Sequence, residues 1–505
     1  MRASIRFRTK LLCLILSIAF WFVLIVPVQA QSLPYFAVLS PPGEPLALHV
    51  LNRLSFGPKS GDLEHIQAIG IDAYLQEQLS PNNRLQPIDL EQKLDRLSSI
   101  FLTSPQLLQI FPQSIQGKKL TLEERNQFRR LIRSQAITAR LLRATESPQQ
   151  LQEIMTAFWF NHFNASFDKG NNSILISSYE NQALRPNALG NFRDLLEATA
   201  KHPVMLTYLD NIRNQAPNPR NPKVGINENY ARELLELHTL GIDGGYKQSD
   251  VIALARILTG WGIVSGKQLA DVDLKGNGFY FESKRHDFSD KVFLGRTIKG
   301  TGEAEGEQVL DILAKHPATA KHLSYKLAQY FVSDRPPQSL VNRLSQSYLK
   351  SDGNIKAVLD TLFHSPEFRD PQYFGKKFKT PYEYVVSSIR ASDLKITNAG
   401  KVDGILKQMS MGIYDCLTPN GYANTEEVWL NPDALLRRLT FATIVTSKKV
   451  GFLKPSDPTS SSLKTEDLYR TLGDRFSKNT QQVIANSPPD QGAMLILGSP
   501  EFMYH

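Results

Sequence analysis

Cysteine is nearly absent from this 505-residue chain, which contains only Cys13 and Cys416. Cys13 lies in an apolar N-terminal run that we expect to be removed, so Cys416 would be the only cysteine of the mature protein. No intrachain disulfide can then form, even in an oxidising compartment. Because no neighbouring base activates Cys416, we expect a buried small side chain and not a nucleophile. The fold must be stabilised by its hydrophobic core.

Several familiar catalytic and binding signatures are also missing. The sequence has no Gly-rich phosphate loop, no Gly-x-Ser-x-Gly elbow, no His-Glu-x-x-His and no Cys-x-x-Cys-His. These absences remove support for nucleotide-binding, serine-hydrolase, zincin and cytochrome c classes. Apart from the N-terminal run, no apolar stretch approaches the length of about 20 residues that spans a bilayer.

The N-terminus has the three-part pattern of a secretory signal peptide. Four basic residues precede an apolar run from Leu11 to Val26, and Val28-Gln29-Ala30 offers a small-residue cleavage site. We expect residues 1–30 to be a signal peptide cleaved after Ala30, which predicts a periplasmic or secreted protein. The alternative is an uncleaved membrane anchor. After cleavage we expect no membrane span.

The mature chain carries only a modest positive charge. Of the 58 Lys and Arg residues, 4 belong to the leader, and the remaining 54 against 49 Asp and Glu leave a net charge of about +5. Nucleic-acid binding calls for a concentrated basic face, so we expect no nucleic acid partner.

Helix signals dominate the rest of the sequence. Thr121 with Glu124 predicts a capping box before a long amphipathic helix, and Ser147-Pro148 with Gln150 predicts another before a helix reaching about His162. Apolar spacing and Gly or Pro stops predict further helices at 46–55, 62–69, 72–79, 191–209, 228–240, 249–259, 303–315, 318–331, 338–350, 354–364, 380–393, 402–411, 433–447 and 464–485. The fold class is therefore mostly α, a multi-helix globular body.

Strand signal is confined to one place, where residues 279–281 and 292–294 flank a charged loop. They predict one small β-hairpin insertion near 279–295. We expect an N-terminal linker at 31–45, a helical body at 46–453, a Pro/Ser linker at 454–462 and a C-terminal helical segment at 463–505. The Pro/Asn loop at 214–224 has no periodicity, and such loops often carry function.

The stretch from Gly225 to Gly245 is the densest in ionisable groups. On a helical wheel, Glu228, Arg232, Glu233 and Glu236 share one arc, opposite an apolar arc that includes His238. One interpretation is an exposed ladder of ion pairs. The other is a cleft in which Glu233 or Glu236 acts as a general acid or base, with Arg232 holding the carboxylates.

Three histidines could complete such a site. His162 and His238 lie on apolar helix faces, so each is expected to be a core imidazole. His162 must then find a hydrogen-bond partner, and His238 is expected to bond a backbone carbonyl near the helix end at Gly241. The alternative is that both join Glu228 and Glu233 around a divalent metal. His286 and Asp287 lie in a polar loop, from which we expect them to reach solvent for proton transfer or metal binding. The alternative is an ordinary charged hairpin tip.

Phrases along most of the chain resemble one family. They are HVLNRLSFGP (49–58), FWFNHFN (158–164), RPNALGNFRDLL (185–196), YLDN (208–211), NENYARELLELHTLG (227–241), GGY…DV…LTGW (244–261), HPATAKHL (316–323) and the final SPEF. Together they resemble the bacterial proteins grouped as domain of unknown function 1800, over residues 46–505. The resemblance implies a mostly helical exported protein without assigned catalytic residues. It also implies a gene neighbourhood with exported sulfatase-like or phosphatase-like proteins.

Two functional hypotheses follow. The first is an envelope or polysaccharide-associated hydrolase in which Arg232, Glu233 and Glu236 meet His286 and Asp287 across a groove, with or without a divalent metal. The second is a non-catalytic periplasmic binding or scaffold protein that contacts a polysaccharide or an exported sulfatase-like or phosphatase-like partner. The sequence leaves open whether the protein is an enzyme.

Overall fold

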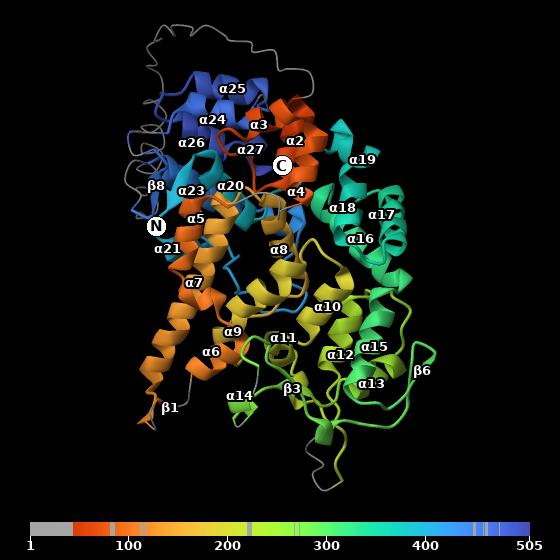
Figure 1. The fold of residues 1–505 in the computed structure, drawn as a ribbon. Coiled ribbons are helices and arrows are strands. Elements are labelled where there is room, and N and C mark those ends of the chain that lie inside the picture. Colours follow the sequence, from red (N-terminus) through yellow and green to blue (C-terminus); the bar gives the residue numbers. More distant parts are fainter. Residues whose placement is uncertain are drawn as a thin grey trace, which may run out of the picture. The chain divides into compact units, whose positions relative to one another are not determined.

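The longest helix of the described chain is joined by a short turn to a second helix, which lies near the middle of the view in Figure 1. The computed structural model describes residues 44–80, 86–111, 114–115, 118–219, 225–266, 268–271, 273–447, 451–457, 459, 463–473 and 475–505. The two helices are α7 (Leu122–Glu146) and α8 (Gln150–His162). The predicted capping box of α7 is confirmed, because Thr121 and Glu124 bond each other's backbone N–H.

The capping box predicted for α8 is wrong. The N-cap is Gln149 and makes no side-chain cap bond. Ser147 Oγ instead accepts from the Gln149 N–H at 3.1 Å, which closes a local turn two residues further on.

The remaining helices precede and follow this pair in the chain. The α-helices before it are α2 (Glu44–Leu54), α3 (Asp62–Ile69), α4 (Ile71–Leu79), α5 (Ile88–Asp95) and α6 (Ser104–Ile110). Those of the middle region are α9 (Asn172–Ser178), α10 (Phe192–Ala200), α11 (Pro203–Tyr208), α12 (Asn229–Glu233), α13 (Gln248–Ile257), α14 (Gln268–Asp271) and α15 (Glu303–Ala314). The later ones are α16 (Pro317–Phe331), α17 (Gln338–Lys350), α18 (Ile355–Phe363), α19 (Pro366–Arg369), α20 (Pro381–Ala391), α21 (Ala399–Gln408), α22 (Glu426–Trp429), α23 (Pro432–Thr446), α24 (Thr465–Leu472), α25 (Lys478–Ala485), α26 (Gly492–Gly498) and α27 (Pro500–Met503).

Short 3-10 turns and two π-helical segments interrupt this pattern. The 3-10 turns are η2 (Ser98–Phe101), η4 (Arg185–Asn187), η5 (Asn211–Arg213), η7 (Ser283–Arg285) and η8 (Pro371–Tyr373). The π segments are η3 (Tyr179–Leu184), which follows α9, and η6 (Leu234–His238), which follows α12. The single helices predicted at 191–209 and 464–485 are each two helices, because Pro203 starts α11 and Gly473, at φ 66°, ends α24.

The strands form four two-stranded antiparallel sheets in the part of the chain that the structure describes. β1 (Ser114–Ile115) pairs with β2 (Lys118–Lys119), and β7 (Leu394–Ile396) with β8 (Leu453–Pro455). β3 (Trp261–Ile263) pairs with β4 (Phe279–Phe281), and β5 (Lys291–Phe293) with β6 (Arg296–Ile298). The mostly α fold class is confirmed, but the hairpin predicted at 279–295 is wrongly paired.

The geometry of one turn explains this wrong pairing. Leu294 and Gly295 both have positive φ and form a two-residue loop between Phe293 and Arg296. Such a loop folds the chain back at once, so β5 finds its partner directly after itself. Segment 279–281 pairs with 261–263 instead, where Gly260, at φ 80°, turns the chain from α13 into an extended strand.

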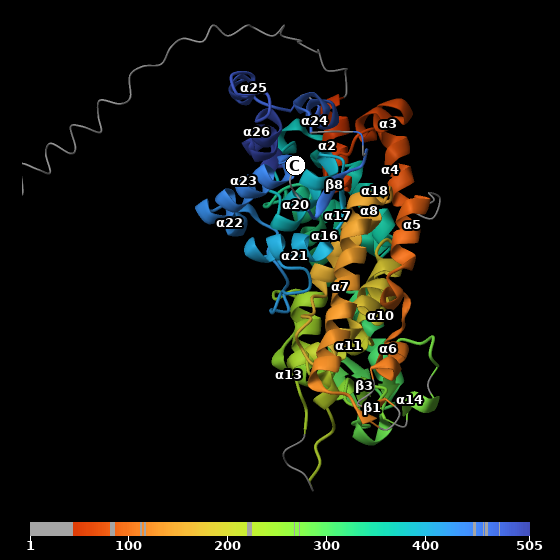
Figure 2. The ribbon, with the colours of Figure 1, turned by 90° about the vertical axis from the view of Figure 1, so that its left-hand side faces the viewer.

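One large apolar core extends from Ala47 to Met503, and a small satellite cluster lies under α5. The first helices and the last helices lie at the same end, opposite α13 and α14, in both ribbon views (Figures 1 and 2). Leu468 of α24 and Ile496 of α26 belong to the large core. The predicted division at 454–462 stays a prediction, since residues 458 and 460–462 lie outside the described ranges.

The predicted signal peptide at 1–30 and most of the linker at 31–45 fall outside the described residues, as do residues 220–224 of the Pro/Asn loop. Within the described ranges, no helix combines the length and apolar character needed to cross a bilayer.

Candidate functional site

The acidic face of α12 and η6 is a ladder of ion pairs. Arg232 contacts Glu228 at 3.2 Å and Glu236 at 3.5 Å, and it also donates to Gln248 at 2.9 Å. The side chain of Arg232 is 39% exposed, that of Glu228 36% and that of Glu236 27%. Ion pairs of this kind stabilise a helix by only a few tenths of a kcal/mol. The ladder interpretation therefore describes this face.

Glu233 is half-buried on the same helix. Burial raises its pKa above the ordinary value, and the neighbouring Glu236 carboxylate raises it further. Its role as a general acid or base stays a prediction.

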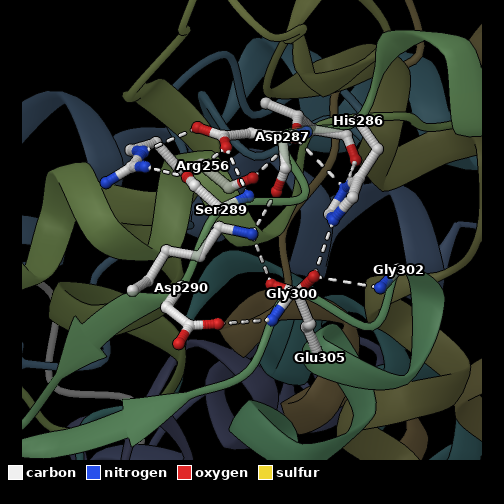
Figure 3. Close-up of polar contacts among 10 residues, drawn as sticks. Arg256, His286, Asp287, Ser289, Asp290, Gly300, Gly302 and Glu305 are labelled. Carbon is white, nitrogen blue, oxygen red and sulfur yellow. Dashed lines mark hydrogen bonds and ion pairs between the residues drawn. The ribbon is translucent and has the colours of Figure 1, made fainter.

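His286 does not reach solvent as we expected, and the Asp287 side chain is only 15% exposed. His286 bonds the Glu305 carboxylate at 2.8 Å and the Thr259 carbonyl at 2.7 Å, as Figure 3 shows for the first of these pairs. Lys291 donates to the other Glu305 oxygen at 2.5 Å, and the side chains of His286, Lys291 and Glu305 are 0% exposed. This buried ion cluster closes the insertion that carries β5 and β6 and leaves a substrate no access to His286.

Asp287 belongs to the edge of that cluster. Arg256 donates to it at 2.7 Å, and Ser289 bonds it through both its N–H and its hydroxyl (Figure 3). Burial alone would raise its pKa, but Arg256 and Ser289 lower the pKa to about 2. Asp287 is thus a permanently ionised anchor for this loop at physiological pH.

The structure does not assemble the predicted groove. Helix α13 separates its two halves: Gln248 at the start contacts Arg232, whereas Arg256 near the end contacts Asp287. Eight helical residues span roughly 12 Å. The predicted metal set of Glu228, Glu233, His162 and His238 is not assembled either, since no group of three or more His, Cys, Asp or Glu in the described ranges could hold a metal ion.

The two core histidines are buried as predicted, and one of them lines a cavity. His162 Nε2 donates to the His238 backbone carbonyl at 3.1 Å. This bond fixes the tautomer, so His162 Nδ1 carries a lone pair and accepts from Lys326 Nζ at 2.9 Å. The hydrogen-bond partner that a buried His162 requires is thus the His238 carbonyl, whereas His238 Nε2 has no hydrogen-bond partner among the described residues.

The π segment η6 supplies that acceptor. Its wider turn ends at His238, and Gly241 donates to Leu235, six residues back, so the His238 carbonyl is left for His162. Gly241 has a positive φ of 83°, and a Cβ there would lie 2.9 Å from the His322 ring. Only glycine fits this helix end without displacing His322.

The cavity has a volume of about 240 Å³ and lies between α8, α16, the start of α20 and residues 411–424. We call it the Lys326 cavity. Its lining includes Phe158, His162, Lys326, Tyr382, Glu383 and Tyr422. Glu383 is the one carboxylate among the described lining residues, and its Oε2 bonds the backbone and hydroxyl of Thr380 in the capping box of α20.

Lys326 is half-buried, and the protein around its amine lowers its pKa to about 8 by desolvation. Its one recorded polar partner in the described structure is the uncharged acceptor His162 Nδ1. Burial, together with Lys326, lowers the pKa of His238 to about 3 and that of His322 to about 4. The amine is thus surrounded by neutral imidazoles and titrates near physiological pH.

Two asparagines of the 158–164 phrase hold the far wall of the cavity. Asn161 bonds both the N–H and the carbonyl of Tyr422, at 2.7 and 2.8 Å. Asn164 donates to the carbonyls of Cys416 and Thr418. Gly421, at φ 74°, lies so close that a Cβ would collide with the Asn161 carbonyl. Side chains from the end of α8 and the two residues after it therefore fix the 416–422 loop over the cavity.

The second π segment supports another wall. Glu180 of η3 accepts from Arg140 at 3.1 Å and from the Tyr414 hydroxyl at 2.9 Å, and both partners line the cavity. Burial would raise the pKa of Glu180, but Arg140, Arg185 and Arg143 lower it below its ordinary value. Cys416, also in the lining, is a buried small side chain as expected.

Sequence reasoning missed Lys326, although α16 carried a signal. On the helix predicted at 318–331, Lys326 lies three residues after Leu323 and four before Tyr330, within the apolar stripe. A lysine on the buried face of a helix is uncommon without a partner. The position of Lys326 on the apolar face was the feature of the sequence that indicated a site.

The comparisons with known proteins agree with the sequence resemblance. A family described as "Protein of unknown function (DUF1800)" matches residues 49–504. No curated protein and no solved structure matches the chain. Since the match covers nearly the whole chain, including every described residue that lines the Lys326 cavity, the protein belongs to the DUF1800 family.

Proposed function

We propose that this protein is an exported hydrolase of the bacterial envelope that acts on small ester groups in the Lys326 cavity. The observation that supports this proposal is the contact of 2.9 Å between Lys326 Nζ and His162 Nδ1 inside an accessible cavity. A base whose pKa lies near the working pH is the most effective proton acceptor.

In the proposed reaction Lys326 is the base that activates water, and His162 accepts a hydrogen bond from the ammonium that forms. The neutral Lys326 amine takes a proton from water as the oxygen attacks the ester carbonyl. The resulting ammonium donates a hydrogen bond to His162 Nδ1, which stabilises it while the tetrahedral intermediate exists. Lys326 then returns the proton to the leaving alcohol oxygen, so that ester and water give acid and alcohol.

An ester is a better candidate than a glycosidic bond. Glycosidases generally use two carboxylates on either side of the bond. The described lining of the cavity offers only Glu383, whose side chain caps α20. An amine can serve ester hydrolysis without a paired carboxylate. Ester groups carried on envelope polysaccharides would connect this chemistry to the predicted polysaccharide partner.

Non-catalytic binding is the second candidate, and the aromatic lining favours it. Phe158, Tyr382 and Tyr422 are among the lining residues of the cavity, and aromatic side chains offer large contact areas to a bound ligand. In this case the protein would hold a polysaccharide end, or present it to an exported sulfatase-like or phosphatase-like partner, without turnover.

Hydrolysis of p-nitrophenyl acetate by the purified mature protein tests the first candidate. We expect Lys326→Met to lower kcat/KM by about 10² to 10⁴, the usual contribution of a general base. Lys321→Met is the matched control, because Lys321 is exposed on the same helix, and it should leave kcat/KM unchanged. Equal rates for wild type and Lys326→Met would contradict the proposal.

Export requires its own test. N-terminal sequencing of the protein recovered from the periplasm or the medium should begin at Gln31 if the signal peptide is cleaved after Ala30. Recovery of the full-length protein in the membrane fraction would instead favour the uncleaved anchor.

A further inference from the structure

The Lys326 amine has the surroundings of a nucleophile as well as those of a base. Its recorded polar partner is His162 Nδ1, and no carboxylate of the described residues forms an ion pair with it. Lysines that form covalent bonds with carbonyl compounds are commonly desolvated in this way, since an ion pair would hold the amine protonated. Lys326 also faces an open volume of about 240 Å³, so a second reactant can reach it.

His162 is placed to move the protons that such a reaction requires. Its Nε2–H is fixed on the His238 carbonyl, which leaves Nδ1 as the acceptor 2.9 Å from the amine. When an amine adds to a carbonyl, it loses a proton as the C–N bond forms. When the resulting carbinolamine loses hydroxide, that oxygen needs a proton. One acceptor next to the nitrogen serves both steps.

We propose that Lys326 forms an imine with a small aldehyde or ketone that enters this cavity. The amine adds to the carbonyl carbon, and the first proton that the nitrogen releases passes through His162 Nδ1 to the carbonyl oxygen, which gives the carbinolamine. The second proton of the nitrogen follows the same route to the hydroxyl group, which leaves as water while the C=N bond forms. Amine and carbonyl thus give imine and water, and no oxidant or reductant is consumed.

The cavity limits the size of the carbonyl ligand. Pockets for drug-sized ligands commonly measure about 300 to 1,000 Å³. A cavity of about 240 Å³ is below that range and suits a compound about the size of a single sugar. The lining also includes amide side chains, among them Gln329 and Asn420, which can hydrogen-bond the hydroxyl groups of a sugar-like aldehyde. The inference rests on the proposed function only in taking the Lys326 cavity as the ligand site.

Reductive trapping with glycolaldehyde, the smallest sugar-like aldehyde, tests the imine. The mature protein is incubated near pH 7.5 with glycolaldehyde and cyanoborohydride, which converts an imine into a stable secondary amine. Peptide mapping then gives the rate of hydroxyethylation at each lysine. We expect Lys326 to react at least about tenfold faster than exposed Lys321, since far more of its amine is neutral at this pH. Similar rates at the two lysines would overturn the inference.

Two variants test whether imine formation depends on the Lys326 amine and on His162, and not only on a generally reactive lysine. Lys326→Arg keeps the positive charge but cannot form an imine, so the fast adduct should vanish while the fold is retained. His162→Gln should slow trapping at Lys326 but not at Lys321. Unchanged trapping at Lys326 in His162→Gln would remove the proton-transfer role and overturn the mechanism.

The same measurements distinguish this inference from the proposed function. If trapping fails while Lys326→Met still loses ester hydrolysis, the imine is wrong and the hydrolase proposal stands. If trapping succeeds while hydrolysis is unaffected by the blocked amine, the hydrolase proposal is wrong and the imine stands.

Discussion

The contribution of Lys326 to the unfolding free energy depends on pH. In the folded protein its pKa is lowered from the ordinary 10.5 to about 8. Below pH 8 both the folded and the unfolded protein carry the proton, and the desolvation penalty is fully present. Between pH 8 and 10.5 only the unfolded chain keeps it, so the unfolding free energy rises with pH across this window.

This dependence predicts that the unfolding free energy of the wild type rises with pH relative to that of Lys326→Met. From pH 7 to 10.5 the wild type should gain on the order of 2 kcal/mol relative to Lys326→Met, somewhat less than the full pKa difference implies, because water in the cavity screens the charge. Urea unfolding at the two pH values measures it. The control Lys321→Met should follow the wild type. A constant difference between wild type and Lys326→Met would refute the lowered pKa.

Single residues differed in how well the sequence predicted them. His162 and His238 were predicted as core imidazoles because they lie on apolar helix faces, and both are buried. The ion-pair ladder at Arg232 followed from i, i+4 spacing alone. His286 was misjudged, because charged neighbours in sequence suggested exposure, while its partner Glu305 comes from the start of α15.

The β5–β6 insertion depends on its buried ion cluster. Lys291→Met would leave the buried Glu305 carboxylate without its ammonium partner, and breaking a buried pair commonly costs about 3 to 5 kcal/mol. Thermal or urea unfolding should show this loss. Lys299→Met is the matched control on the next strand segment, since its pair with Asp290 is exposed and should contribute at most about 1 kcal/mol. Equal small effects would mean that the cluster contributes little.

Elements with local signals were predictable, and those set by distant partners were not. The capping box of Thr121 and Glu124 fixed the start of α7 from four residues of sequence. The β5–β6 turn escaped notice because Leu294 takes a positive φ that usually belongs to Asn or Gly. The π segments η3 and η6 have no recognised sequence signature, and both support the Lys326 cavity.

Residues of the helical body and of the C-terminal segment share one core, so we expect them to unfold together. Leu195 of α10 and Leu468 of α24 are fully buried in the same cluster. Calorimetry of the mature protein should therefore show a single unfolding transition. Leu195→Ala and Leu468→Ala should each lower that transition, by about 2 to 5 kcal/mol in stability. Two transitions, each sensitive to one variant only, would establish the 463–505 segment as a separate domain.

The helical class of the whole molecule could be predicted, but the position of its cavity could not. The bonds that build the cavity join residues 76, 164 and 261 positions apart in the sequence. Helix patterns show which face of each helix is apolar, and they do not show which faces meet. For that reason the predicted catalytic residues, on 228–236 and 286–287, lie outside the cavity lining, and of the predicted metal ligands only His162 belongs to it.

The π segment at 234–238 has a consequence for how this family can change. A π turn holds one residue more than the α turn it replaces, so it is equivalent to a one-residue insertion into a helix. Deleting one residue there would restore the regular ladder and rotate everything that follows by about 100° around the helix axis. The His238 carbonyl would then point away from His162, which could adopt its other tautomer and present an N–H to Lys326. A single-codon deletion, outside the cavity lining itself, would thus convert an acceptor beside the amine into a donor.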